Sequence, residues 1–400
     1  MKYVVLIGDG MGDYPLAELN GLTPLEAAHT PNMDSLALNG MLGLAQTIPE
    51  NRQAGSDTAN MAFMGINPSD FVYGRGPMEA AAMNINLAED DIAFRCNLVD
   101  LQYLPDGTVI MHDYAAGHIT SPESHRLIND LQKKLGRHGL TFYPGVSFRH
   151  VAVWKNASPI AATVPPHDRT EKAVNDILDA DGDLKPIMDL ARASWKVLEN
   201  HPINRARREL GQATGNSIWL WGQSARPAFP TLQERYGLEG IVVTAVDLLK
   251  GIGQMTGMKI IEVPGATGYL DTNYAGKVQA TLDGLAAGSD FAYLHVEAPD
   301  EASHAGRLDL KMRAINDFDS LVVGPLLAGL KKMGPHRILL GTDHFTPLST
   351  RTHARDAVPF ALWGEKVPAN QGRAYNEKAA AATGVFVPQA YSLVDGMIKS

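Results

Sequence analysis

The sequence predicts an α/β protein whose large domain is built on a mostly parallel β-sheet. Three short apolar runs end abruptly in polar residues, and they lie at Val4–Ile7, Phe291–Val296 and Arg337–Leu340. Runs of this length and composition are typical of buried parallel strands. Because one run opens the chain and two lie late in it, we expect the large domain to be discontinuous. A chain of 400 residues has room for this domain and for an insertion.

The insertion has the pattern of a second, smaller α+β domain. We expect residues 1–80 and 280–400 to form the large domain and residues 81–279 to form the inserted one. The predicted elements of the insertion are a helix capped by Ser121 that ends at Leu135, strands at Val151–Trp154 and Ile241–Val243, and a helix at Pro186–Asn200. Each has an apolar face, so the insertion is expected to have its own small core.

Charge and cysteine content exclude several classes of protein. The formal net charge is −9, which argues against a nucleic-acid partner because a phosphate backbone needs a basic surface. Cys96 is the single cysteine, so a disulfide framework and a cysteine zinc site are excluded, and a free buried thiol is expected. The apolar runs are much shorter than a membrane span or the apolar core of a signal peptide. We expect a cytoplasmic protein without a membrane partner.

Acidic residues and histidines follow all three predicted strands. In open α/β sheets the ligand site lies beyond the carboxyl ends of the strands. Asp9 follows the first run, Asp300 follows the second, and Asp343 and His344 follow the third. Because these strands are predicted to be parallel, their carboxyl ends meet at one edge of the sheet. These side chains are therefore candidates for one shared site.

The spacing of these residues suits metal binding. A single acidic residue or histidine is more often a structural or surface group than a ligand. Here Asp300 and His304 are four residues apart and face the same way on a helical turn, and His353 follows nine residues after His344. The six candidate ligands are Asp9, Asp300, His304, Asp343, His344 and His353. Six oxygen and nitrogen ligands suffice for two ions with about three protein ligands each.

The glycine-rich segment Gly8–Gly12 does not match a dinucleotide-binding motif. That motif requires a third glycine where this chain has Asp13. The glycines are better explained by a backbone that passes close to an ion held by Asp9.

Ser56 has two interpretations. It stands where a polar loop leads into the apolar Met61–Met64 segment, so it could serve simply as a helix N-cap. It could also be a nucleophile, because a helix amino terminus stabilises an alkoxide and an incoming phosphate, and a metal ion lowers the pKa of a hydroxyl. The Gly-x-Ser-x-Gly elbow of the common serine hydrolases is missing from the sequence around it.

Taken together, these residues resemble the alkaline phosphatase superfamily of two-metal phosphoryl-transfer enzymes. Over almost its whole length the chain is similar to the archaeal-type cofactor-independent phosphoglycerate mutases. The matching motifs are His29-Thr30-Pro31-Asn32, Phe94-Arg95-Cys96-Asn97, Pro165-Pro166-His167-Asp168, Trp219-Leu220-Trp221-Gly222 and Val263-Pro264-Gly265-Ala266-Thr267-Gly268. The resemblance implies an alkaline-phosphatase-like three-layer domain with a mostly parallel sheet, interrupted by an inserted α+β lid domain.

The resemblance also implies the metal ligands and the chemistry. One ion would be surrounded by Asp9, Ser56, Asp343 and His344, and the other by Asp300, His304 and His353. Ser56 would be phosphorylated during a glycolytic isomerisation of 3-phosphoglycerate to 2-phosphoglycerate, without 2,3-bisphosphoglycerate. The two divalent ions would be manganese or magnesium, with zinc or cobalt as substitutes.

A mutase must also hold a small phosphorylated carboxylate and exclude water. We expect the inserted domain to act as the lid and to supply substrate-binding groups. The candidates are His118, Arg149, His167, Asp168, Arg205, Arg208 and Lys277. Arg205 and Arg208 are three residues apart, and paired guanidinium groups on a helix suit a carboxylate or phosphate. The alternative for each arginine is a solvated surface charge.

The acceptor of the phosphoryl group is left open by the metal ligands. A homoserine kinase-like phosphotransferase would use the same two-metal serine chemistry, and so would a phosphatase or phosphonate hydrolase with a wetter site. A metal-binding scaffold that had lost catalysis would be expected to lack Ser56 or a ligand, and this chain has them all. The sequence does not identify an oligomeric interface.

Overall fold

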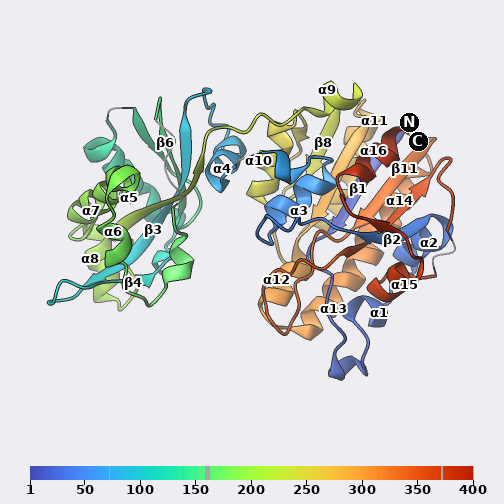
Figure 1. The fold of residues 1–400 in the computed structure, drawn as a ribbon, viewed down its shortest axis with the longest axis horizontal. Helices are drawn as coiled ribbons and strands as arrows, with labels where there is room; N and C mark the ends of the chain where they lie inside the picture. The colour runs from blue at the N-terminus through green and yellow to red at the C-terminus, as the bar shows by residue number, and fades with distance from the viewer. Residues whose placement is uncertain (72, 138, 158–162, 371–372, 400) are drawn as a thin grey trace. The chain divides into compact units, whose positions relative to one another are not determined.

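The computed structural model describes residues 1–71, 73–137, 139–157, 163–370 and 373–399. The chain forms two compact units (Figure 1), of which unit 1 comprises Met1–Phe71 and Phe229–Ser400 and unit 2 comprises Val72–Ala228. The predicted fold class is confirmed, since unit 1 is α/β with a mostly parallel sheet.

The sheet of unit 1 has eight strands. Their order is β13 (Phe386–Val387), β2 (Met41–Ala45), β12 (Val358–Gly364), β11 (His336–Gly341), β1 (Lys2–Gly8), β10 (Phe291–Val296), β8 (Gly240–Val243) and β9 (Lys259–Ile260). β12 pairs antiparallel with both of its neighbours, and the other pairs of strands are parallel. The three strands predicted from the apolar runs are β1, β10 and β11, and they lie side by side in the middle of the sheet.

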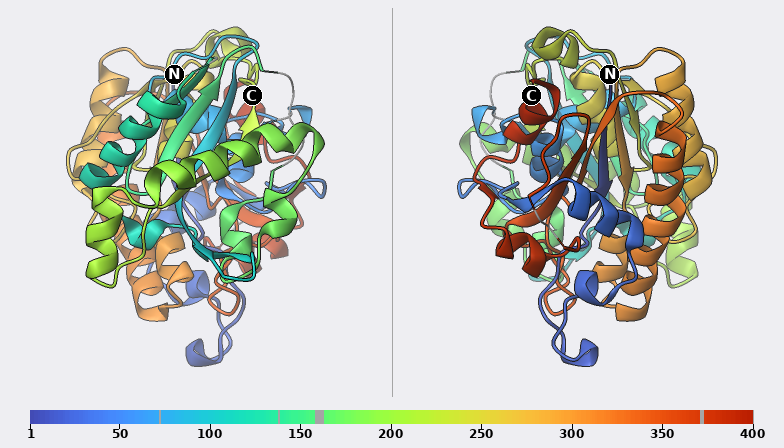
Figure 2. Two further views of the ribbon diagram at one scale, coloured as in Figure 1. Left: turned by 90° about the vertical axis from the view of Figure 1, so that its left-hand side faces the viewer. Right: turned by 90° about the vertical axis from the view of Figure 1, so that its right-hand side faces the viewer.

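Helices cover both faces of this sheet, which makes three layers (Figures 1 and 2). One face is covered by α2 (Pro31–Asn39), α11 (Tyr274–Ala286), the π-helix Phe318–Val323 and α14 (Gly324–Leu330); the other is covered by α3 (Ser56–Phe63), α10 (Asp247–Met255) and α16 (Ser392–Lys399). A glycine in each of two helices shows that α11 and α10 lie on opposite faces of the sheet. A Cβ atom on Gly284 of α11 would lie 2.4 Å from Ile241, and one on Gly253 of α10 would lie 2.6 Å from Val242. Since Ile241 and Val242 are consecutive in β8, they point to opposite faces. The remaining helices of unit 1 are α1 (Pro24–Ala27), α9 (Leu232–Tyr236), α12 (Ala298–His304), α13 (Leu308–Asp317) and α15 (Glu377–Ala382).

Unit 2 is an antiparallel sheet with helices packed on it. β3 (Ile92–Tyr103) pairs with β6 (Arg149–Trp154) and β7 (Ser217–Ser224) along its first half and with β4 (Val109–Asp113) at its end, while β5 (Leu140–Tyr143) pairs with β6. The helices are α4 (Arg75–Ala82), α5 (Ser121–Leu135), α6 (Asn175–Leu178), α7 (Lys185–Leu198) and α8 (Pro202–Glu209). Cys96 of β3 is buried and free, as predicted.

Three details of the predicted insertion are wrong. α5 is capped by Thr120 rather than Ser121, because Thr120 and Glu123 form the reciprocal capping box. The expected carboxyl boundary at residue 279 is too late, since unit 2 ends at Ala228. The predicted strand at Ile241–Val243 is β8, which pairs with β10 in the large sheet. A short apolar run of this kind does not reveal which sheet it joins.

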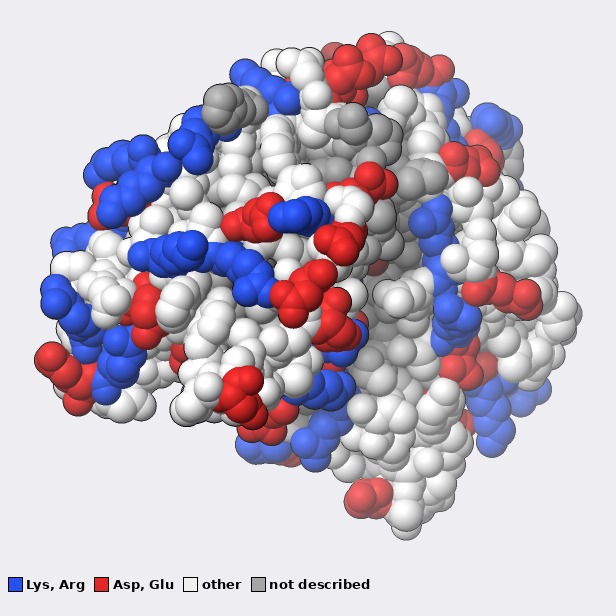
Figure 3. Space-filling view, turned by 60° about the vertical axis from the view of Figure 1, so that its left-hand side comes forward, with Lys and Arg blue, Asp and Glu red and all other residues white. Residues whose placement is uncertain are grey.

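Charges of both signs are mixed on the surface. On the face shown in Figure 3, lysine and arginine side chains are interspersed with aspartate and glutamate side chains. An anionic substrate must therefore be recognised by a local group of cations rather than by a broad basic surface. None of the helices in the described part of the chain has the length and hydropathy that a bilayer crossing requires.

Candidate metal centre

Three buried aspartates meet at the carboxyl ends of the central strands. β1 lies between β10 and β11, with Gly8 opposite Val296 and Ile7 opposite Gly341. The residues that follow these strand ends include Asp9, Asp300 and Asp343, whose exposed fractions are 2%, 5% and 0%. The topology of the parallel sheet therefore brings together carboxylates that are far apart in the sequence.

The first group of donors is Asp300, His304 and His353. His304 Nε2 lies 3.1 Å from Asp300 Oδ2 and 3.0 Å from His353 Nε2. His304 Nδ1 lies 2.9 Å from the Arg351 carbonyl, which can only accept, so Nδ1 carries a proton. His304 Nε2 is therefore the nitrogen that a metal ion would use once this nitrogen has lost its own proton. Although burial opposes ionisation, the hydrogen bonds from His304 and His353 hold the pKa of Asp300 well below its usual range.

The second group is Asp9, Asp343, His344 and Ser56. His344 Nε2 lies 3.1 Å from Ser56 Oγ, 3.4 Å from Asp9 Oδ1 and 3.3 Å from Asp343 Oδ2. Ser56 is the first residue of α3 and Gly55 is the N-cap, so the serine hydroxyl lies at a helix amino terminus without serving as the N-cap itself. The serine, the imidazole and the two carboxylates converge on one point.

Asp343 is held in place by several donors. The Gly10 amide donates to Asp343 Oδ1 at 3.0 Å, and Asn60 Nδ2 donates to Asp343 Oδ2 at 2.7 Å. Asn60 lies one turn after Ser56 in α3, and its own Oδ1 accepts from the Tyr293 hydroxyl. The helix that carries Ser56 is thus attached to the carboxylate beside it.

His295 belongs to this region, although the sequence does not predict it as a site residue. It lies in β10, fully buried, with Nε2 2.9 Å from Asp9 Oδ2 and Nδ1 3.2 Å from Thr244 Oγ1. Burial lowers its pKa to about 3, so the ring is neutral. The available signal was a histidine inside an otherwise apolar strand, which is also the pattern of an ordinary core histidine.

The donor atoms fit divalent cations. Asp9 Oδ1 is buried and, within the described part of the chain, has no hydrogen-bond donor. Burial raises the pKa of Asp9 well above its usual value, and the charges of Asp343, Asp300 and Glu297 raise it further. Buried carboxylates that face one another are unfavourable unless a cation or proton compensates them. Donor atoms lie within 4.8 Å of one another in three groups, which are Asp300, His304 and His353; Asp9, Asp300 and His344; and Asp9, His295 and Asp343. Carboxylate oxygens and histidine nitrogens are ligands that Mn²⁺ and Zn²⁺ accept.

Lys277 lies beside this centre and not in the inserted domain. It belongs to α11 in unit 1, is fully buried, and donates from Nζ to the carbonyl of His295 at 3.1 Å. Burial lowers its pKa to about 8, while the charge of Glu297 acts in the opposite direction. The expectation that Lys277 belongs to the insertion is wrong because the chain returns to the large sheet before α11.

In unit 2, three of the expected substrate-binding residues share one group of aromatic rings. The His118 ring lies 5.6 Å from that of Phe148, and the Arg149 guanidinium carbon lies 5.7 Å from the same ring. His167 lies 5.4 Å from the Trp221 ring and 3.7 Å from Asp168. The Tyr114 ring connects the two sets, since it lies 6.0 Å from both Phe148 and His167.

Two further arginines join this group. The guanidinium carbon of Arg95 lies 4.6 Å from the centre of the Trp221 ring, and that of Arg75 lies 5.9 Å from it. Burial lowers the pKa of Arg95, and the ion pair with Glu79 acts in the opposite direction. We call the set Arg75, Arg95, Arg149, His118 and His167 the cationic cluster after its three arginines; burial lowers the pKa of His167. Arg75 and Arg95 were not among the candidates, because nothing in the sequence showed that they stack on Trp221.

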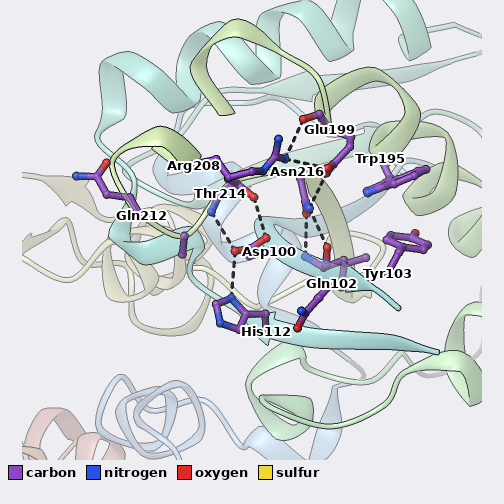
Figure 4. A pocket seen from close by; sticks show the side chains of 13 residues that line it. Asp100, Gln102, Tyr103, His112, Trp195, Glu199, Arg208, Gln212, Thr214 and Asn216 are labelled. Atoms are coloured by element: carbon purple, nitrogen blue, oxygen red, sulfur yellow. Dashed lines mark hydrogen bonds and ion pairs between the residues drawn. The ribbon is translucent and has the colours of Figure 1, made fainter. Parts of the chain in front are cut away.

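The predicted arginine pair on α8 does not belong to this cluster. Arg208 forms an ion pair of 2.9 Å with Glu199 beside a hollow of about 510 Å³, shown in Figure 4. The hollow lies at Asp100–Tyr103, the opposite end of β3 from Arg95. The carboxylates that line the hollow already accept hydrogen bonds from the protein. Thr214 donates to Asp100, and Asn216 donates to Glu199. Arg205, on the same helix, is exposed.

Comparisons with known proteins agree on one family. Residues 37–204 match the family model described as 2,3-bisphosphoglycerate-independent phosphoglycerate mutase. A probable 2,3-bisphosphoglycerate-independent phosphoglycerate mutase from Geobacter sulfurreducens is 47% identical, and the comparison covers 100% of both chains. The 2,3-bisphosphoglycerate-independent phosphoglycerate mutase from Methanosarcina barkeri is also 47% identical, with 100% of both chains covered.

Solved structures show the same fold. A protein from Pyrococcus horikoshii is 30% identical, with a TM-score of 0.83 over 100% of this chain and 96% of the other. The cofactor-independent phosphoglycerate mutase from Thermoplasma acidophilum is 24% identical, with a TM-score of 0.68 over 100% and 99%. Given the full-length relatives at 47% identity, this chain belongs to the 2,3-bisphosphoglycerate-independent phosphoglycerate mutase family.

Proposed function

We propose that this protein interconverts 3-phosphoglycerate and 2-phosphoglycerate without 2,3-bisphosphoglycerate, and that Ser56 carries the phosphoryl group between the two half-reactions. The observation that supports this most directly is the position of Ser56 Oγ, at the start of α3 and 3.1 Å from His344 Nε2 in the donor cluster. A nucleophile in this place suits phosphoryl transfer, since the helix amino terminus favours the negative charge of both the alkoxide and the phosphate.

The first half-reaction forms a phosphoserine. Two divalent ions would neutralise the charge of the phosphoryl group and lower the pKa of the serine hydroxyl. One ion would be held by Asp300, His304 and His353, and the other by Asp9, Asp343 and His344. Ser56 Oγ attacks phosphorus, the Oγ–P bond forms, and the bond from phosphorus to the 3-oxygen of glycerate breaks. The proton of the Ser56 hydroxyl ends on that 3-oxygen.

The second half-reaction reverses these roles on the neighbouring carbon. The 2-hydroxyl of glycerate attacks the phosphoserine, the new O–P bond forms, and the Oγ–P bond breaks. The proton of the 2-hydroxyl returns to Ser56 Oγ. No external phosphate donor is needed because the phosphoryl group stays on the enzyme between the two steps.

We further propose that the cationic cluster of unit 2 recognises the carboxylate of the substrate. Arg149 is exposed at the start of β6, and its guanidinium lies against Phe148. A guanidinium group can bind a carboxylate through two parallel hydrogen bonds. His118 and His167 are the candidate proton carriers of this cluster. This assignment replaces the α8 arginines as the main anion-binding group.

Replacement of Ser56 by alanine is expected to abolish turnover. Without the hydroxyl oxygen, no phosphoserine forms. The purified manganese-loaded protein is mixed with 3-phosphoglycerate in the absence of 2,3-bisphosphoglycerate, and 2-phosphoglycerate is followed through coupled enolase. Ser69→Ala, at an exposed serine, is the control and should keep full activity. Phosphorylation at Ser56, read by mass spectrometry after acid quenching, should disappear in the Ser56→Ala variant; activity in this variant would contradict the mechanism.

Replacement of Arg149 by methionine is expected to raise KM for 3-phosphoglycerate about 10- to 100-fold, because hydrogen bonds to a charged group contribute about 1.5–3 kcal/mol each and partial solvation offsets part of the loss. The measurement is the steady-state rate as a function of substrate concentration. Arg126→Met, at an exposed arginine of α5, is the matched control and should leave KM unchanged. If both variants behave alike, Arg149 does not bind the substrate.

Ion binding by Asp300, His304 and His353 is expected to weaken as the pH falls. In the ion-free protein, the hydrogen bond to Asp300 raises the pKa of His304 to about 9. Below that pH an incoming ion must displace a proton from His304, so the apparent affinity should rise up to about tenfold per pH unit and level off above about pH 9. Competition with a chelator for Mn²⁺ between pH 6 and 10 tests this. His304→Ala should flatten the slope; an affinity independent of pH in the unaltered protein would contradict the assignment.

A further inference from the structure

The loop after β11 contains a threonine that contacts both groups of donors. Thr346 is fully buried, and its Oγ1 lies 2.5 Å from Asp300 Oδ1 and 3.1 Å from His344 Nδ1. Asp300 belongs to the first donor group and His344 to the second. Thr346 therefore links one member of each donor group through a single hydroxyl, since Asp300 lies in α12 and His344 lies in the loop after β11.

The hydrogen-bond capacity of the hydroxyl determines the direction of both contacts. A hydroxyl has one proton, and an ionised carboxylate can only accept, so Thr346 donates to Asp300. The oxygen of Thr346 must then accept from His344 Nδ1, which requires a proton on Nδ1. In a neutral ring this leaves His344 Nε2 with its lone pair directed at the point where Ser56 Oγ, Asp343 Oδ2 and Asp9 Oδ1 converge, at 3.1, 3.3 and 3.4 Å. The opposite tautomer would place two lone pairs against each other at Nδ1 and lose a buried hydrogen bond.

The backbone of Thr346 is fixed independently of its side chain. Its amide donates to the Gly12 carbonyl at 3.1 Å, and its carbonyl accepts from Lys311 Nζ at 3.0 Å. Lys311 is fully buried and also donates to Asp13 Oδ2 at 2.9 Å, so it connects this loop to the loop after β1. A substitution that removes only the hydroxyl should therefore leave the loop in place.

We infer that Thr346 is a positioning residue that holds His344 in the Nδ1-protonated tautomer and ties it to Asp300, so that the ligands of both ions are oriented together. The inference rests on the proposed function for its catalytic consequence. The tautomer itself is a property of the ion-free protein. A ligand histidine with its second nitrogen fixed by a hydrogen bond binds metal about 10- to 100-fold more tightly than one without.

The test compares Thr346→Val, which keeps the shape of the side chain and removes the hydroxyl, with Thr346→Ser, which keeps the hydroxyl. Long-range ¹H–¹⁵N spectra of ion-free protein labelled in histidine report the tautomer, and His344→Asn identifies the His344 signals. We expect the Nδ1-protonated pattern in the unaltered protein and in Thr346→Ser, and a shift toward the other tautomer in Thr346→Val. Affinity for Mn²⁺ should fall about 10- to 100-fold in Thr346→Val alone.

A control removes a buried threonine hydroxyl elsewhere. Thr256→Val, at the end of α10, should lower thermal stability without changing the His344 signals or the affinity for Mn²⁺. An Nε2-protonated His344 in the unaltered protein would overturn the inference. This measurement does not need the variant, so it tests the inference even if Thr346→Val fails to fold. Unchanged signals and affinity in a folded Thr346→Val would also overturn it. If the tautomer responds as expected but the unaltered protein has no mutase activity, the inference stands and the proposed function fails.

Discussion

The convergence of three buried carboxylates at one edge of a parallel sheet is the constraint on which the rest of the structure depends. Asp9, Asp300 and Asp343 come from three adjacent strand ends, and burial together with mutual repulsion raises the pKa of Asp9 well above its usual value. Such an arrangement is unfavourable by itself and becomes favourable when cations bind. We infer that ion binding contributes to the stability of this edge as well as to its chemistry.

A second layer of hydrogen bonds keeps these candidate ligands in place. Asn60 fixes Asp343, His295 contacts Asp9, and the hydroxyl of Thr346 lies between Asp300 and His344. Each of these partners lies on a helix, strand or anchored loop of unit 1, so the ligand geometry is determined by the packed sheet and its flanking helices. This is how a centre built from separate strand ends acquires the rigidity that phosphoryl transfer needs.

The sequence predicts best those site residues that directly follow a recognisable strand. Asp9, Asp300, Asp343 and His344 could be assigned because each follows an apolar strand, and the structure brings them together as that pattern indicates. Long-range choices were not accessible. The strand at Ile241–Val243 has no feature that distinguishes one sheet from another, and His295 resembles a core histidine. Nothing near Arg95 or Arg208 in the sequence shows that the first is buried against Trp221 and the second is exposed beside Glu199. The sheet that a strand joins and the partners of these side chains depend on contacts between segments that are distant in the sequence.

Anomalous scattering from crystals of the manganese-loaded protein would locate the ions and show whether the buried aspartates hold them. We expect two peaks per chain, one within about 2.0–2.3 Å of ligand atoms of Asp300, His304 and His353, and the other at that distance from Asp9, Asp343 and His344. A single peak, or peaks only at surface carboxylates, would contradict the claim that the buried aspartates are arranged to hold two ions.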